Sequence, residues 1–338
     1  MNKSFHALVV NKIEQSFSRR IESLTLNDLP EAGVLIRVCY SGINYKDSLA
    51  AIPNGHILKN YPFVPGIDLS GIVVSSEDPR FKKDDPVIVT GYGLGVSHFG
   101  GFSEYAQIPA DWIVPLPSGL TLKEAMRIGT AGFTAALSVF RLEQAGIAPD
   151  KGEVIVTGAS GGVGSHAVAL LSDLGYSVVA SSGKSAEASS YLKMLGAQSV
   201  IAREAVFDGT VKPLQKQQWT SAVDSVGGKP LAGLLGRMRY GGYVAACGLA
   251  AGSELPATVF PFILRGVNLL GIDSVSCPME LRQVIWQRLA ELHKPEKLAA
   301  IAQKEIPLSQ LPNALPALLS GKKIGRTIVI LNPEVTDE

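Results

Sequence analysis

The sequence predicts a mixed α/β fold in which a doubly wound parallel sheet is inserted into a β-rich domain. Three observations support this. The N-terminal third of the chain consists of short strand-like runs separated by Gly and Pro. The next region alternates strand-like and helix-like runs, which is typical of a parallel sheet covered on both faces. The chain then closes with GRTIVIL, a strand-like run with nothing helical after it.

The N-terminal region shows the alternation of a half-buried strand. In GVLIRVCYSGIN, the apolar residues Val34, Ile36, Val38 and Tyr40 fall on one side, because successive side chains of a strand point to opposite faces. The same strand-and-turn pattern recurs in VPGIDLSGIVV, DPVIVTGYG and FSEYAQIP. We expect a compact, β-rich domain that curls toward a barrel.

The pattern changes near Ser118. The run LTLKEAMRIGTAGFTAALSVFRLEQAG is helical, and a strand–helix–strand unit follows it. Further apolar strands are expected at AQSVIAR, SAVDSV, GGYVAACG and NLLGIDSV, and a further helix at MELRQVIWQRLAELHK. We therefore expect a β-rich domain over residues 1–126, an inserted α/β domain over 127–302 and a return to the first domain over 303–338.

The overall composition is that of an ordinary globular protein. Of the 338 residues, 46% are hydrophobic and 18% charged, and the formal net charge is +1. A chain of this length is typical of two domains, and so small a net charge favours neither a nucleic acid nor a membrane partner. No run approaches the ~20 apolar residues of a membrane span, and the N-terminus lacks a signal-peptide pattern. Three widely spaced cysteines, Cys39, Cys247 and Cys277, read as reduced thiols of a cytoplasmic protein.

The strongest local signal is the segment EVIVTGASGGVGSHAVALLSDLG. A short buried strand at 154–156 precedes a helix whose apolar face is formed by Val163, Ala167, Leu170, Leu171 and Leu174. Between strand and helix lies a glycine turn with GxGxxG spacing and Ala159 in the first position. Such a turn lets the backbone amides and helix dipole bind a pyrophosphate, which predicts a Rossmann dinucleotide site. The expected contacts are Ser160, Gly161, Gly162 and Val163; a glycine-rich turn without a ligand is the alternative.

The end of the second strand indicates which dinucleotide binds. NAD-binding units place an Asp or Glu there to bind the ribose 2′-hydroxyl, but YSVVA is followed by Ser181, Ser182, Gly183 and Lys184. Hydroxyls and a lysine suit a 2′-phosphate, so we expect NADPH, with Arg203 as a second phosphate ligand. Alternatively, Lys184 is only a solvated surface lysine.

Taken together, these features resemble the medium-chain dehydrogenase/reductase superfamily over nearly the full chain. The similarity is closest to its zinc-free, quinone-oxidoreductase-like branch, which includes acryloyl-CoA reductase. It rests on GASGGVG, VDSVGG and GRTIV, and more closely on GINYKDSLA, VPGIDLSG, DPRF, IGTAGFTA, VAACGLA and PFILRGVNLLGIDSV. The resemblance implies a Rossmann domain inserted in a GroES-like catalytic domain. It also implies a homodimer, in which NLLGIDSV is an edge strand that pairs with its twin.

Zinc members of this superfamily ligate the metal with a cysteine and a histidine from two N-terminal motifs. The matching positions here are Asn44 in GINYKDS and Ile67 in PGIDLSG. An isoleucine cannot bind zinc and an amide is a poor replacement for a thiolate. The four cysteines of the structural zinc lobe are also missing from GYGLGVSHFGGFSEYAQ. We expect no metal.

The resemblance also assigns the catalytic loop. Tyr45 would contact the cofactor, and its hydroxyl would orient the substrate or supply a proton; a tyrosine that only packs is the alternative. Asp47 is expected to tie the loop to neighbouring amides, and Lys46 to face solvent or the site. Thr130 and Thr134 would border the nicotinamide or cap and pack their helix.

Other contacts follow from resemblance alone. Leu249, Ile263 and Ser274 would complete the cofactor pocket, whereas Cys247 is expected to be a small buried thiol rather than a nucleophile. Arg326 would reach the cofactor or a substrate phosphate. Apart from the resemblance, Lys59 and Arg265 are candidates for the phosphates of a coenzyme A substrate, because such sites use scattered basic residues on loops; ordinary surface residues are the alternative.

Without a metal to stabilise an alkoxide, the chemistry is expected to use a substrate that spreads its own charge. Hydride addition to an α,β-unsaturated thioester or ketone gives an enolate, which needs only hydrogen-bond donors and a proton source. The leading hypothesis is NADPH-dependent reduction of a short enoyl-CoA, with acryloyl-CoA giving propanoyl-CoA. Quinone or general enone reduction is the second hypothesis. An NADPH-binding redox sensor or structural protein is a third, and zinc-dependent alcohol oxidation through other ligands is a fourth.

Overall fold

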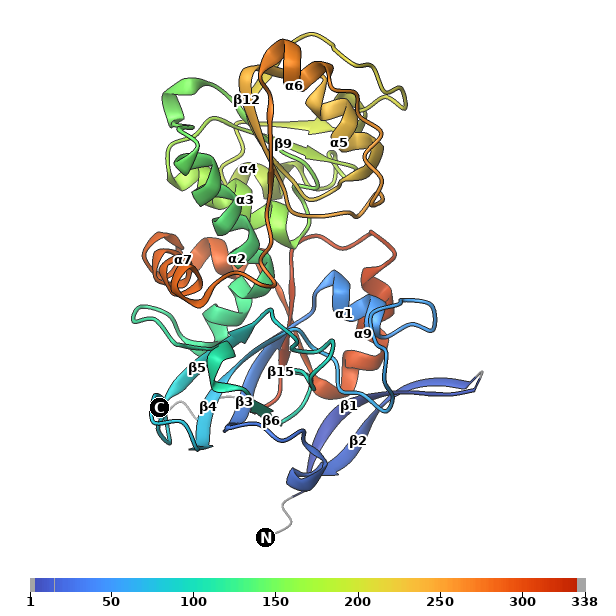
Figure 1. The fold of residues 1–338 in the computed structure, drawn as a ribbon, viewed down its shortest axis with the longest axis vertical. Coiled ribbons are helices and arrows are strands. Elements are labelled where there is room, and N and C mark those ends of the chain that lie inside the picture. Colours follow the sequence, from blue (N-terminus) through green and yellow to red (C-terminus); the bar gives the residue numbers. More distant parts are fainter. Residues whose placement is uncertain (1–3, 15, 333–338) are drawn as a thin grey trace. The chain divides into compact units, whose positions relative to one another are not determined.

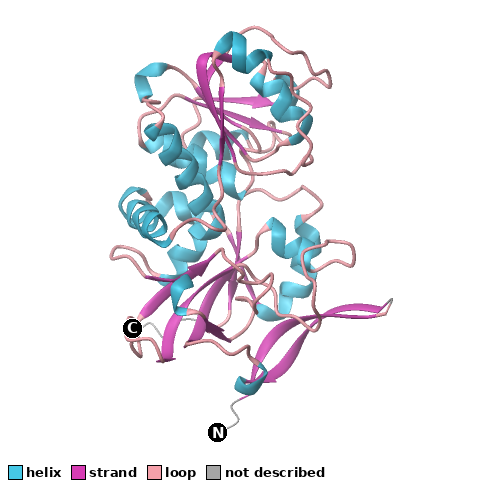
Figure 2. Cartoon of the chain, viewed as in Figure 1, coloured by secondary structure: helices cyan, strands magenta, loops and turns pink. Residues whose placement is uncertain are grey.

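The computed structural model describes residues 4–14 and 16–332. The chain divides into two compact units, one formed by Met1–Thr130 with Val275–Glu338 and the other by Ala131–Ser274. Figure 1 traces the chain through both, and Figure 2 shows which parts are strands and helices. Each unit has its own sheet, so the mixed α/β class and the inserted parallel sheet predicted from sequence are confirmed.

The first unit is built on a seven-stranded sheet with a two-stranded hairpin. The strand order is β14-β15-β3-β4-β5-β7, with β6 paired to β3. Apart from the parallel pair β14–β15, neighbouring strands are antiparallel. The strands are β1 (Ser4–Ile13) and β2 (Ser16–Thr25) of the hairpin, then β3 (Val34–Gly42), β4 (Asp68–Ser76), β5 (Pro86–Thr90), β6 (Tyr105–Ile108), β7 (Ile113–Pro115), β14 (Lys304–Pro307) and β15 (Thr327–Ile330).

The terminal strand β15 pairs with β3, with Val329 opposite Ser41. The last segment of the chain therefore returns to the first sheet. The predicted alternation along β3 holds for Val34 and Ile36, which are fully buried and separated by partly exposed neighbours. From Val38 onward both sides of the strand are buried, so this end of β3 lies deep in the unit. Nothing in the N-terminal sequence had singled out the hairpin β1–β2.

The helices of this unit are α1 (Tyr45–Ala50), α7 (Met279–Leu292), α8 (Pro295–Ile301) and α9 (Leu311–Leu318), and α2 (Leu122–Gln144) runs from the first unit into the second. We expected α2 to be one regular helix. The structure instead breaks it at Gly129, whose φ of 50° and ψ of −160° are not helical. A conformation with positive φ is easy only for glycine, so the break is encoded at that residue.

The second unit contains a six-stranded parallel sheet of order β10-β9-β8-β11-β12-β13. In chain order this is 3-2-1-4-5-6, the doubly wound Rossmann arrangement, whose crevice for a dinucleotide lies at the carboxyl ends of the strands where the order reverses. Figure 1 shows α3 on one side of the sheet and α5 on the other. The strands are β8 (Val154–Val156), β9 (Val178–Ser182), β10 (Ser199–Ala202), β11 (Trp219–Asp224), β12 (Met238–Ala246) and β13 (Asn268–Gly271).

The helices of this unit are α3 (Gly162–Asp173), α4 (Ser189–Met194), α5 (Gly228–Leu235) and α6 (Phe260–Arg265). Short 3₁₀ turns occur in both units. The second unit has η3 (Pro149–Lys151) and η4 (Arg203–Ala205), and the first has η1 (Leu26–Asp28), η2 (Ala110–Trp112) and η5 (Leu308–Gln310). Apolar side chains of β8, β11, β12 and α5 form the main core. The strand β13 lies at one edge of the sheet, where the sequence had placed an edge strand. Within the described ranges, no helix is long and apolar enough to cross a membrane.

The unit boundaries differ from the ranges expected from sequence. The first boundary follows Thr130 rather than residue 126, and residues 275–302 group with the first unit rather than the second. Hydrogen bonds explain the second difference. Arg282 on α7 is fully buried and donates to the carbonyl of Thr90, at the end of β5, and to that of Val275, over 2.9 and 3.1 Å. The helix α7 is thereby hydrogen-bonded to the end of β5 in the first sheet.

Candidate active site

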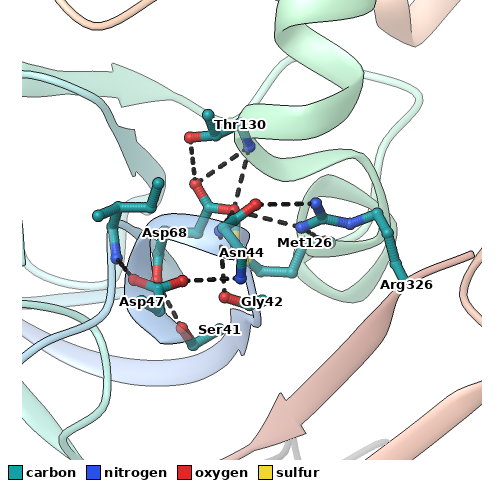
Figure 3. A network of polar contacts seen from close by, with 9 residues as sticks. Ser41, Gly42, Asn44, Asp47, Asp68, Met126, Thr130 and Arg326 are labelled. Atoms are coloured by element: carbon teal, nitrogen blue, oxygen red, sulfur yellow. Dashed lines mark hydrogen bonds and ion pairs between the residues drawn. The ribbon is translucent and has the colours of Figure 1, made fainter. Parts of the chain in front are cut away.

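Asp68, the first residue of β4, is the centre of a buried polar network in the first unit (Figure 3). Its carboxylate accepts hydrogen bonds from the Thr130 backbone N–H at 3.0 Å and from the Thr130 hydroxyl at 2.5 Å. The Asn44 amide donates to it over 2.8 Å, and the Arg326 guanidinium over 3.2 Å. A fully buried carboxylate requires such partners, and these come from three distant segments of chain.

Arg326 immediately precedes β15, and its side chain is only 2% exposed. One terminal nitrogen donates to Asn44 Oδ1 over 3.0 Å, and the other donates to the Met126 carbonyl as well as to Asp68. Burial lowers the pKa of Arg326, while the charge of Asp68 opposes that shift. Both terminal nitrogens are engaged inside the first unit. The expectation that Arg326 reaches a cofactor or substrate phosphate was therefore wrong, because Asp68 already provides its counter-charge.

The same network fixes the start of α1. Asn44 is the N-cap of this helix, and Asp47 completes a capping box by accepting a hydrogen bond from the Asn44 backbone N–H over 2.8 Å. The second Asp47 oxygen accepts from the Ile67 N–H over 2.9 Å. Asp47 thus ties the loop to neighbouring amides, as expected. Burial, and then the charge of Asp68, raise the pKa of Asp47 to about 7, against these hydrogen bonds.

Tyr45 is the first residue of α1 and directly follows Asn44. Its side chain is 49% exposed, whereas Asp47 and Ser48 on the same helix are fully buried. Lys46 is half-buried. The helix therefore presents the Tyr45 phenol outward while its other side is held by the polar network.

In the second unit, the glycine turn joins β8 to α3, as predicted. Gly161 is the N-cap of α3, and Gly158 has a φ of 60°. A Cβ at Gly164 would lie 2.3 Å from the Gly158 carbonyl oxygen, so this close approach requires glycine. Of the expected contacts, Gly162 and Val163 begin the helix, and Ser160 precedes the cap. The first amides of a helix lack intrahelical partners and suit an anion.

The turn is linked to the end of β9. The hydroxyls of Ser160 and Ser182 hydrogen-bond over 2.8 Å, and the Ser182 hydroxyl accepts from the Lys184 N–H over 3.0 Å. Arg203 lies against Gly183, since a Cβ there would come 3.2 Å from the Arg203 Cδ atom. Burial lowers the pKa of Lys184, with the charge of Glu187 opposing it. The Ser160 and Ser182 hydroxyls, the Lys184 backbone N–H and the Arg203 side chain therefore meet where β9 and β10 end.

Arg203 has 75% of its side chain exposed and pairs with Glu204 over 2.9 Å. Such an exposed pair contributes little free energy, so it leaves the guanidinium available to a competing anion. The structure thus brings together Ser160, Ser182, Gly183, Lys184 and Arg203, which the sequence had selected separately.

Asp224, at the carboxyl end of β11, connects three loops of the same edge. One carboxylate oxygen accepts from the Thr157 hydroxyl over 2.5 Å and the other from the Gly227 N–H over 2.8 Å. Its backbone carbonyl accepts from the Cys247 N–H over 2.8 Å and from the thiol over 3.2 Å. Burial raises the pKa of Asp224, and raises that of Cys247 to about 12. The Cys247 thiol is therefore neutral, as a packing role requires, although Cys247 is half-buried rather than buried as expected.

The remaining predicted residues are more dispersed. Leu249 follows β12 and Ile263 lies on α6, with 61% and 68% exposed. The Ser274 hydroxyl accepts from the Thr134 hydroxyl over 2.8 Å. Lys59 is exposed, but Arg265 is committed to the carbonyls of Gly236, Met238 and Gln215. The expectation that Arg265 meets a substrate phosphate was wrong, because its guanidinium closes these loop ends instead.

Sequence reasoning did not single out Asp68 or Asp224. Asp68 was visible only as one letter of VPGIDLSG and Asp224 as one letter of VDSVGG. Asp68 begins β4 and Asp224 ends β11. An acidic residue at the end of an apolar strand was the signal that could have pointed to each of them.

Two family profiles match the chain. "Alcohol dehydrogenase GroES-like domain" matches residues 30–118, and "Zinc-binding dehydrogenase" matches residues 162–291. Among curated proteins, the putative quinone oxidoreductase of Bacillus subtilis is 56% identical over 98% of this chain and 100% of its own length. The probable acrylyl-CoA reductase of Escherichia coli is 50% identical over 96% and 99%. The acrylyl-CoA reductase of Ruegeria pomeroyi is 48% identical over 97% and 99%.

Solved structures agree with these relatives. A Salmonella enterica oxidoreductase in complex with NADP superposes with a TM-score of 0.94 at 47% identity, covering 96% of this chain and 99% of the other. The Bacillus subtilis protein with NAD bound gives 0.94 at 56% identity, covering 97% and 100%. The Escherichia coli protein with bound NADPH gives 0.93 at 48% identity, covering 96% and 100%.

The residues at the zinc-ligand positions do not fit a metal ion. The Asn44 amide nitrogen donates to Asp68 and Gly42, and its oxygen accepts from a guanidinium. Ile67 offers only a hydrocarbon side chain. Within residues 4–14 and 16–332 there is also no group of three His, Cys, Asp or Glu side chains placed to hold a metal. The donor set at this position is that of a hydrogen-bonded ion pair.

Proposed function

Because the chain belongs to the medium-chain dehydrogenase/reductase superfamily, we propose that it is an NADPH-dependent oxidoreductase that reduces the activated C=C bond of a short enoyl-CoA. The proposed reaction converts acryloyl-CoA to propanoyl-CoA. The observation that carries this proposal is sequence identity over nearly the full length. The chain is 50% identical to a probable acrylyl-CoA reductase and 48% identical to an acrylyl-CoA reductase. The polar ends of β8, β9 and β10 support the choice of cofactor.

In this proposal, the α3 amides that follow Gly161 bind the pyrophosphate, and Ser182, Lys184 and Arg203 bind the 2′-phosphate. Gly164 lets the helix pack tightly enough for the backbone to approach the pyrophosphate. Leu249, Ile263 and Ser274 complete the pocket. The bound NADPH supplies a hydride. Solved relatives that hold NADP or NADPH favour the phosphorylated cofactor, although one relative holds NAD.

The protein's own residues then have to stabilise the negative charge that forms on the substrate and to supply a proton. Hydride addition at the β-carbon shifts the π electrons to the thioester oxygen as an enolate, and a proton then adds at the α-carbon. Hydrogen-bond donors stabilise such an oxyanion without a metal ion. We assign Tyr45 to the substrate, where its exposed phenol orients the thioester or delivers that proton.

We propose that the reaction is independent of zinc. The carboxylate that would attract a cation, Asp68, is already neutralised by Arg326. Metal analysis of purified protein is expected to find no stoichiometric zinc, and activity should survive a chelator. Stoichiometric zinc whose removal abolishes turnover would contradict this assignment.

We also propose a homodimer that pairs β13 with its twin. The strand lies at the edge of the parallel sheet, where unpaired backbone groups are available. Light scattering should give twice the chain mass, and a monomer would exclude this pairing.

The second candidate function is quinone reduction, which the 56% identical relative with that name favours. A substrate panel separates the two. Purified protein is mixed with NADPH or NADH and with acryloyl-CoA, crotonyl-CoA, a simple enone or a quinone, and absorbance at 340 nm is followed. The primary proposal expects the highest kcat/KM with acryloyl-CoA and NADPH. Turnover of quinones with none of acryloyl-CoA would overturn it. Tight NADPH binding without turnover of any acceptor would indicate a binding or structural role instead.

A further inference from the structure

We infer that Arg326 is a positioning residue whose buried guanidinium acts as a built-in cation beside the residue that takes the first zinc-ligand position. Through Asn44 it sets the start of α1, the helix that carries Tyr45. The inference rests on the proposed function only in its choice of Tyr45 as the residue to be positioned. It is supported by the space made for the guanidinium, by the use of the Asn44 amide and by the balance of buried charge.

The chain makes room for the guanidinium at two glycines. A Cβ at Gly42, the last residue of β3, would lie 2.4 Å from Arg326 Nη2. A Cβ at Gly129 would lie 2.4 Å from the same nitrogen and 2.4 Å from Asp68 Oδ2. Gly129 is also where α2 leaves helical geometry, which aims the following Thr130 N–H at Asp68. Two separate segments are therefore shaped around one ion pair (Figure 3).

The Asn44 side chain is fully used, and Arg326 donates to its amide oxygen. The amide nitrogen donates to Asp68 over 2.8 Å and to the Gly42 carbonyl over 3.3 Å. The amide oxygen accepts from Arg326 over 3.0 Å. Since only one orientation of the amide satisfies all three contacts, the guanidinium acts with Asp68 and Gly42 to fix the N-cap of α1. Tyr45 is the next residue and follows the cap.

The charges that face Arg326 explain why a cation is needed. Asp68 contacts it, and Asp47, bonded to the Asn44 N–H, adds its charge at longer range. Without Arg326, two buried carboxyl groups would share one small region without a cation. A buried ion pair is weak evidence for stability, because desolvation offsets its attraction. The contact of Arg326 with Asn44, the residue before Tyr45, points to positioning instead.

The test compares Arg326→Lys and Arg326→Ala with Arg282→Ala. Arg282 is a fully buried arginine of the same unit that contacts Thr90 and Val275 rather than Asn44. Lysine at 326 keeps a charge but not the forked geometry. Each variant is measured for NADPH Kd, melting temperature, kcat and KM, using the acceptor that the wild type reduces best. Hydrogen exchange of residues 45–51 is measured in parallel without any substrate.

For Arg326→Lys we expect an NADPH Kd within about twofold of wild type, with kcat lowered about 10- to 100-fold, since misplacing a reacting group by ~1 Å has an effect of that size. KM should change much less than kcat. Exchange at 45–51 should become faster, and low millimolar guanidinium should partly restore kcat in Arg326→Ala. Arg282→Ala should lower the melting temperature without this pattern.

An unchanged kcat and unchanged exchange in folded Arg326→Lys would overturn the inference, as would an equal loss in Arg282→Ala. If Arg326→Ala does not fold, the lysine variant decides alone. Failure of the wild type to reduce acryloyl-CoA would overturn the proposed function but not this inference, because the exchange measurement requires no turnover.

Discussion

The polar network around Asp68 joins residues as far apart as Asn44 and Arg326, which are 282 positions apart. The glycine turn, in contrast, lies within residues 157–165 of the second unit. The first region depends on buried side-chain charges, and the second on backbone amides and on the absence of side chains. Backbone amides positioned by a short turn can be recognised in one stretch of sequence. A charge cluster exists only after the chain has brought its members together.

The glycine turn and the Asp68 network should also be sensitive to different kinds of mutation. A turn that works through close approach is sensitive to added bulk, whereas a charge network is sensitive to the loss of a partner. Three experiments test this contrast, in decreasing order of effect.

The largest effect is expected from Gly164→Val. The new Cβ would lie 2.3 Å from the Gly158 carbonyl oxygen, so the turn must move away from the position that binds the pyrophosphate. We expect NADPH affinity to fall by more than about 100-fold, since losing several charge-assisted hydrogen bonds at about 1.5 kcal/mol or more each has that effect. Fluorescence titration measures it. The control is Gly33→Ala, because nothing lies within 4 Å of a Cβ at Gly33; near-wild-type binding by Gly164→Val would refute the assignment.

An intermediate effect is expected from Lys184→Ala. If Lys184 binds the 2′-phosphate, NADPH affinity should fall about 10-fold or more, as for one hydrogen bond to a charged group. NADH affinity should barely change. Paired titrations with both cofactors give the ratio. The control is Lys216→Ala, an exposed lysine that precedes the amino end of β11. Equal losses for both cofactors would argue against a 2′-phosphate contact.

The smallest effect is expected from Asp47→Asn. The pKa of Asp47 is raised from 3.8 to about 7 in the folded protein. Between these values the folded state binds more protons than the unfolded state, so the stabilising contribution present at low pH is lost as the pH rises through 7. Wild type should lose on the order of 1 kcal/mol of unfolding free energy between pH 5 and 8 relative to Asp47→Asn. Urea denaturation at both pH values measures the difference.

The control for that measurement is Asp28→Asn. Asp28 makes a comparable capping box with Thr25, but it is fully exposed and its pKa is lowered, first by the Thr25 side chain. It should therefore not reproduce the difference between pH 5 and 8. An equal pH dependence in wild type and Asp47→Asn would show that burial does not protonate Asp47 near neutral pH.

The sequence predicted the parallel sheet well because each βαβ element is encoded locally. Val154–Val156, the glycine turn and the apolar positions of α3 form one continuous pattern. Ser182 ends the next strand, and Lys184 lies two residues beyond it. The expectation that Asp47 ties its loop to neighbouring amides was confirmed, and one of its partners, Asn44, lies only three residues away. The break in α2 was missed, because a single glycine within an otherwise helical pattern gives only a weak signal.

Long-range contacts explain the other errors. The resemblance suggested Arg326 as an anion ligand and the charge suggested Arg265, because an arginine in the sequence does not show its partner. Asp68 neutralises one and three backbone carbonyls hold the other. The grouping of residues 275–302 with the first unit likewise depends on Arg282 reaching Thr90 across 192 positions.

Residue type and local spacing were enough to predict the fold class and the glycine turn, and the resemblance to the superfamily was enough to predict the exchange of zinc-ligand residues at Asn44 and Ile67. The contact of Arg326 with Asn44, and the link of both to Thr130 through Asp68, could be seen only in the folded chain. The same holds for the position of Arg203 against Gly183. The physical reason is that buried charge is stable only with its partners, and the folding of the whole chain selects those partners.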